Sequence, residues 1–141
     1  MEQEIIERWE RGKENLRKYF EVTPQSEYDE YPKIVSALIH HCLNYGDLRD
    51  DKKFSEEFEV SDHGDYQGTQ IFLLHMDCYQ PDAQHYYVFD NYYGSCSGCD
   101  TLLGISGYES GIPTKEQVDE YMTLCLHMVQ RMKWLGDLLK G

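Results

Sequence analysis

Two cysteines separated by two residues stand in the stretch YYGSCSGCD, which runs from Tyr92 to Asp100. A Cys-x-x-Cys pair has the ligand gap of a zinc knuckle, and it is also the spacing of a redox-active dithiol. Glycines and serines fill the stretch, so it also suits a turn in which Cys96 and Cys99 pack as small apolar groups. The spacing alone leaves three interpretations open, namely a metal site, a thiol site and a turn.

The elements that would position this stretch follow from the periodicity of the apolar residues. Helical spacing covers residues 2–20 and 33–45, and again the segment from Thr114 to Leu139, where Gln117 stands in capping-box position. Alternation or short apolar runs predict strands at 54–61, 69–76 and 85–93, and a short helix follows at 101–109. The sequence therefore predicts one α+β domain over residues 1–141: a three-stranded antiparallel meander with two N-terminal helices and a long C-terminal helix packed on one face.

This geometry restricts the ligands that a zinc ion could take. His75, Cys78 and His85 lie near the turn between the second and third strands, whereas Cys96 follows the opposite end of the third strand. About eight extended residues put roughly 25 Å between those two ends. The turn before the second strand is on the correct side, so the metal alternative is a site of Cys96, Cys99, His63 and Asp65.

A thiol-dependent activity has only the local order of strand, Cys-x-x-Cys and helix in its favour. That order resembles the thioredoxin-like proteins over about seven residues, but the βαβ framework is absent and the neighbouring acids would raise a thiol pKa. No nucleophile elbow, P-loop or HExxH pattern occurs in the chain. The sequence therefore favours a binding protein over an enzyme, with no cofactor other than zinc in the metal alternative.

Charge is the clearest global property of the sequence. Acidic residues outnumber basic ones 26 to 13, for a net charge of −13. Residues 56–130 hold thirteen acids and a single base, Lys115. Nucleic acids and anionic membranes are bound through Lys and Arg, so this distribution argues against both. It favours a basic protein partner or a cation, and solubility alone is the other explanation.

Targeting signals are missing from the sequence. No apolar run approaches the length of a membrane span, and the N-terminus has no apolar signal core. The chain has five cysteines, which is an odd count. We expect a cytoplasmic protein with reduced thiols.

Tyrosines accompany the acids, because eight of the twelve fall within residues 56–130. Alternation in the third strand puts Tyr86, Val88, Asp90 and Tyr92 on one face, and Tyr87, Phe89, Asn91 and Tyr93 on the other. Rigid tyrosines interleaved with carboxylates suit contacts to Arg and Lys, although half-buried sheet tyrosines have the same pattern. The predicted partner-binding residues are Glu57, Glu59, Asp62, Asp65, Tyr66, Tyr87, Asp90, Tyr92 and Tyr93.

The segment from His63 to Leu103 also resembles a group of known sequences. YYGSCSGCDTLL after a tyrosine-rich strand, with GDYQG before the previous strand, is similar to small uncharacterised bacterial, phage and plasmid proteins. The resemblance covers about a third of the chain, implies a mobile-element setting and brings no catalytic residues. Together with the acidity it leads to one hypothesis: an inhibitor that mimics nucleic acid and blocks a basic host nuclease or defence effector, as anti-CRISPR proteins do.

Self-association is a further expectation, and it depends on the last helix. Apolar residues lie outside its main stripe, and three short strands cannot cover a helix of that length on all sides. Exposed apolar surface marks interfaces, so the sequence predicts a homodimer through the terminal helices. The flanking residues are Leu124, Leu126, Met128, Trp134 and Leu138.

Overall fold

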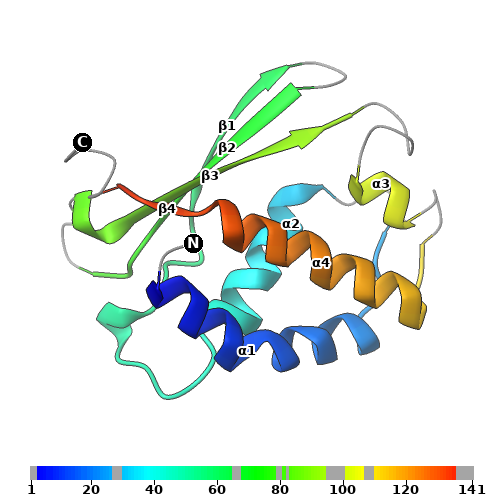
Figure 1. The fold of residues 1–141 in the computed structure, drawn as a ribbon, viewed down its shortest axis with the longest axis horizontal. Coiled ribbons are helices and arrows are strands. Elements are labelled where there is room, and N and C mark those ends of the chain that lie inside the picture. The colour runs from blue at the N-terminus through cyan, green and yellow to red at the C-terminus, as the bar shows by residue number, and fades with distance from the viewer. Residues whose placement is uncertain are drawn as a thin grey trace.

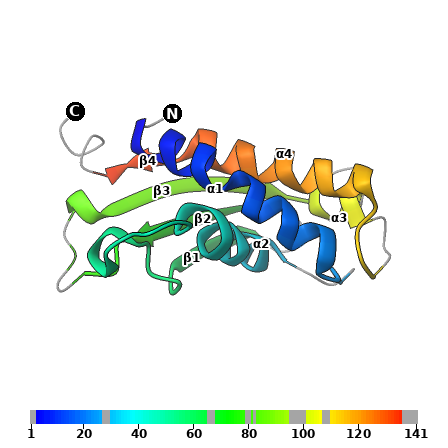
Figure 2. The same ribbon diagram turned by 90° about the horizontal axis from the view of Figure 1, so that it is seen from below.

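The fold is one antiparallel sheet with the helices α1, α2 and α4 on the same side of it (Figure 1, Figure 2). The computed structural model describes residues 3–26, 30–64, 68–78, 81, 83–94, 101–106 and 110–135. Its strand order is β1-β2-β3-β4, and all three neighbouring pairs are antiparallel. The elements are α1 (Gln3–Val22), α2 (Tyr31–Leu38), η1 (Ile39–Leu43), η2 (Asp50–Lys52), β1 (Glu59–Gly64), β2 (Gly68–His75), η3 (Ala83–His85), β3 (Tyr86–Tyr93), α3 (Thr101–Ser106), α4 (Lys115–Arg131) and β4 (Lys133–Trp134).

The predicted α+β class is confirmed, but the sheet has four strands and not three. The last helix was expected to reach Leu139, yet it ends at Arg131. Met132 has an extended backbone (φ −63°, ψ 131°), and the next two residues pair with β3 as β4. The start of α4 was predicted correctly, since the Thr114 hydroxyl accepts from the Gln117 N–H at 3.2 Å in a complete capping box.

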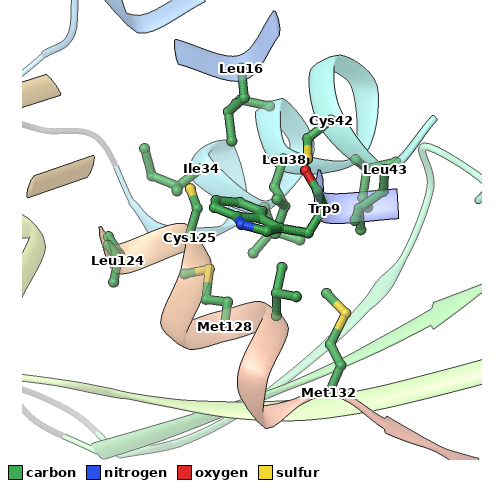
Figure 3. Close-up of a cluster of buried hydrophobic side chains, with 14 of the residues drawn as sticks. Trp9, Leu16, Ile34, Leu38, Cys42, Leu43, Leu124, Cys125, Met128 and Met132 are labelled. Carbon is green, nitrogen blue, oxygen red and sulfur yellow. Dashed lines mark hydrogen bonds between the residues drawn. The ribbon is translucent and has the colours of Figure 1, made fainter. Parts of the chain in front are cut away.

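The helices form a tightly packed layer of their own. Figure 3 shows side chains from α1, from α2 with the π-helical turn η1, and from α4 converging around Trp9. Gly12 is essential to this packing, because a Cβ there would lie 2.1 Å from the Cys42 carbonyl oxygen of η1. A glycine costs a helix about 1 kcal/mol relative to alanine. Here it lets α1 and η1 cross with their backbones in contact.

A buried arginine joins this layer to one end of the sheet. The Arg8 guanidinium donates to the Leu43 carbonyl at 2.8 Å, donates to the Lys52 carbonyl and pairs with Glu4. It also lies 5.0 Å from the centre of the Phe54 ring. Arg8 thus supplies donors to the last carbonyls of η1 and η2, which would otherwise lack helical partners.

Candidate protein-interaction face of the sheet

The strand register sorts the side chains of the sheet onto two faces. Opposite residues in an antiparallel pair share a face, so each row across the sheet belongs to one side. The inner face contacts the helices and is buried at Phe72, Leu74, Tyr87, Phe89 and Asn91. The other side, which we call the open face, points away from the helices (Figure 2). It carries Glu59, Ser61, Thr69, Ile71, Leu73, His75, Tyr86, Val88, Asp90 and Tyr92.

The centre of the open face is apolar and hollowed. A hollow of about 560 Å³ is lined by Ile71, Leu73 and Val88 together with Glu59, Val60 and Ser61 of β1. Ile71 is 37% exposed and Tyr92 is 55% exposed. The open face therefore combines an apolar centre with a tyrosine and carboxylates, as protein interfaces do.

Three of the predicted partner-binding residues share this face. Glu59, Asp90 and Tyr92 are all exposed, and they stand on β1 and β3 on either side of the apolar centre. Glu57 is exposed just before β1. The structure thus brings part of the predicted set together around a hydrophobic patch.

Asp62 and Tyr93 form a separate group at the far end of the sheet, in rows that belong to the inner face. The Tyr93 hydroxyl donates to Asp62 Oδ1 at 2.6 Å, and Gln70 Nε2 donates to Oδ2 at 3.2 Å. Asp62 itself remains exposed on the edge strand. This carboxylate is thus held in place by its neighbours and is still accessible to a partner.

Tyr87 does not contribute to an exposed surface, contrary to the expectation. Its side chain is 5% exposed, its hydroxyl donates to Glu4 Oε2 at 3.2 Å, and its ring packs 5.4 Å from that of Phe54. Alternation correctly separated Tyr87 from Tyr92. It could not tell which of the two faces contacts the helices, because a period of two treats both faces alike.

The remaining predicted residues fall mostly outside the described part of the chain. This applies to Asp65 and Tyr66 and to the cysteine pair Cys96 and Cys99. His63 is described only as the β1 position opposite Thr69. Within the described residues, no group of three or more His, Cys, Asp or Glu side chains is arranged to hold a metal ion.

The other cysteines differ sharply in their surroundings. Burial raises the pKa of Cys42 to about 12. Burial also raises the pKa of Cys125, to which the nearby Cys42 adds. Both are free thiols in the helical layer, whereas Cys78 is a free thiol that is partly exposed. Neither buried thiol is suited to nucleophilic chemistry, because the reactive species is the thiolate.

A second hollow, of about 430 Å³, lies at the β4 end of the sheet. Glu4, Cys78, Tyr87 and Trp134 are among the residues that line it. The Glu4 carboxylate accepts from both Arg8 and Tyr87, and the Trp134 indole N–H donates to the Gln84 carbonyl at 2.8 Å. These polar groups, among the described residues of the lining, are engaged in hydrogen bonds within the protein.

Sequence reasoning missed the apolar centre of the open face. The run TQIFLLHM has apolar residues on both faces at its centre, which is typical of a central strand. β2 is central in the sheet, but only its inner face is covered by helices. A strand that is apolar on both faces, in a sheet with helices on one side only, would have predicted an exposed apolar patch.

No family model, curated protein or solved structure matches this chain. In the part of the chain that the structure describes, no helix has the length and apolar character needed to cross a membrane.

Proposed function

We propose that this chain is a protein-binding module that presents its open sheet face to a basic, nucleic-acid-binding protein. The observation that carries the proposal is the exposed apolar centre around Ile71 and Leu73, with Glu59 and Asp90 beside it, in a chain of net charge −13. Burying the apolar centre would provide part of the affinity, because removing apolar surface from water is favourable. The carboxylates would select a cationic partner and speed the encounter.

The distribution of paired charges supports the sheet over the helices as the binding surface. On α1 and nearby, bases compensate acids: Lys13 pairs with Glu10 at 2.7 Å, and Arg17 pairs with Asp119 at 2.6 Å. Strands β1, β2 and β3 contain no Lys or Arg, and the short strand β4 adds one base, Lys133, at the opposite edge in the row of Val88. A cationic partner therefore meets mainly carboxylates at the β1 side of the sheet and mixed charges at the helices.

The partner class follows from the same chemistry. A groove that binds nucleic acid is lined by Lys and Arg that neutralise phosphates, and carboxylates can occupy those positions instead. The resemblance to phage and plasmid proteins supports an inhibitory role against a host nuclease or defence effector. In this role the module is a nucleic-acid mimic of the anti-CRISPR kind, and it has no catalytic task.

The experiment is a capture assay with competition. The immobilised chain is expected to retain a basic DNA-binding protein from bacterial lysate at low ionic strength, and added duplex DNA should displace it. The triple reversal Glu57→Lys, Glu59→Lys and Asp90→Lys should abolish retention. Retention of no basic protein at low salt, or a captured protein that DNA does not displace, would sink the proposal.

The matched control reverses three exposed acids of the helical layer, Glu14→Lys, Glu21→Lys and Glu120→Lys. It makes the same change in net charge as the triple reversal on the sheet. If both sets of reversals weaken capture equally, net charge alone is responsible and the sheet face is not the binding surface.

The homodimer stays a prediction. Among the described residues, however, the helix face on which it depended is not exposed. Leu124 and Met128 are buried, Leu126 packs partly against the core, and Trp134 belongs to β4. Leu138 lies outside the described residues. α4 packs against α1, α2, α3 and β3, so Leu124 and Met128 are covered within one chain.

A further inference from the structure

The two edges of the sheet are built differently. At the β3 edge, β4 pairs with Tyr87 and Val88. Farther along that edge, the Arg131 guanidinium donates to the Asp90 carbonyl and to Asn91 Oδ1, both at 3.1 Å. β1 is the opposite edge, and among the described strands it pairs only with β2.

β1 has no proline, lysine or bulge, three of the features that protect natural edge strands from pairing with another chain. Its charged residues are the acids Glu59 and Asp62, which disfavour an acidic strand and favour a basic one. β1 reads EVSDHG over six residues and pairs with β2 in an unbroken register from Glu59 to Gly64. Val60 on this strand is 38% exposed, and the 560 Å³ hollow begins at the same strand.

We propose that the β1 edge accepts an extended segment of the basic partner as a fifth strand. This inference rests on the proposed function and specifies how the partner binds. Main-chain hydrogen bonds to the edge would give affinity, and alternate side chains would give specificity. The side chains of the added strand would meet those of β1 at cross-strand distances of about 5 Å.

The charges of β1 define the segment that fits. Glu59 faces the open side and Asp62, three residues later, faces the inner side. Opposite charges across strands stabilise a pair, so a Lys or Arg is expected opposite each acid. Between them, apolar residues are expected opposite Val60 and, beside the hollow, opposite Ser61. The segment therefore has the pattern basic–apolar–apolar–basic.

A second copy of this chain does not fit the edge. β1 contains two acids and no Lys or Arg, so the β1 strand of a second copy would bring no base opposite either acid. Each copy also carries a net charge of −13, and two copies therefore repel one another. Charge complementarity therefore selects a basic strand from a different protein.

The test uses the whole chain and three blocked hexapeptides at low ionic strength. The first peptide is Thr-Lys-Val-Val-Lys-Thr, the second is the same peptide N-methylated at every interior amide, and the third has the scrambled order Lys-Lys-Thr-Thr-Val-Val. Binding is followed by titration, and hydrogen exchange reports on individual amides. We expect the first peptide to bind and to slow amide exchange in residues 59–64 but not in 86–93. The N-methylated and scrambled peptides should bind at least about tenfold more weakly.

Charge reversals on the protein make the result specific to the edge. The double variant Glu59→Lys, Asp62→Lys should bind the first peptide at least about tenfold more weakly. The control double variant Glu14→Lys, Glu21→Lys should change binding of that peptide by less than about threefold. Equal binding of the N-methylated peptide would overturn strand addition and leave charge-driven binding standing. Failure of the first peptide to bind would also overturn strand addition. The capture assay tests the proposed function independently of that result. Unfolding curves of each variant show whether it is folded.

Discussion

The two faces of β2 carry similar side chains but lie in opposite environments. On the inner face, Phe72 stacks on Phe89 at 5.0 Å between ring centres, and Leu74 is fully buried. On the open face, Ile71 is exposed and Leu73 is half-buried beside a hollow. A strand that is apolar on both sides is typical of a sheet covered on both sides. Here the helices cover only one of the two sides (Figure 1).

The largest effect on stability is expected when a leucine of the inner face is replaced by alanine. The neighbouring leucine of the open face is the comparison. Leu74→Ala removes a fully buried side chain and should lower the free energy of unfolding by about 3 kcal/mol, because a cavity forms behind it. Leu73→Ala shortens a half-buried side chain and should cost about 1 kcal/mol or less. Urea unfolding curves measure both. Equal losses would mean that the open face is already covered in the free protein.

Thiol labelling extends the comparison to the helical layer behind the inner face. With a pKa of about 12, Cys42 is a thiolate in about one molecule in 10,000 at pH 8, and burial also blocks access to it. We expect iodoacetamide to label Cys78 at least about a hundredfold faster than Cys42 or Cys125, as mapped by mass spectrometry. In denaturant the three rates should converge. Rapid labelling of Cys125 in the folded chain would show that the layer opens.

The smallest effect is expected for Cys96 and Cys99, which lie outside the described residues. If Cys96 and Cys99 only fill a glycine turn, Cys96→Ser and Cys99→Ser should each change the free energy of unfolding by less than about 0.5 kcal/mol. Metal analysis of protein purified without added zinc is the second measurement. Stoichiometric zinc that is lost in either variant would favour the metal alternative, and the chain would then have a third functional region.

The sequence predicted most elements because their signals are local. The capping box at Thr114, the stripes of α1 and α2, and the three hairpin-connected strands depend on neighbours within one or two turns. β4 was missed because residues 133–134 continue the apolar pattern of α4, and only pairing with β3 makes them a strand. Gly12 appeared to weaken α1, whereas its role depends on Cys42, thirty residues away in the chain.

The candidate site also has features that follow from local sequence and features that depend on long-range contacts. By itself, the sequence determined the excess of acids, the tyrosines in the strands and the alternation that parts Tyr87 from Tyr92, because composition and a period of two need no third dimension. Only the tertiary structure decided that the helices cover the Tyr87 side and leave Ile71 exposed. The reason is that alternation distinguishes the two faces of a strand without ranking them, and their exposure depends on where the connecting chain places the helices.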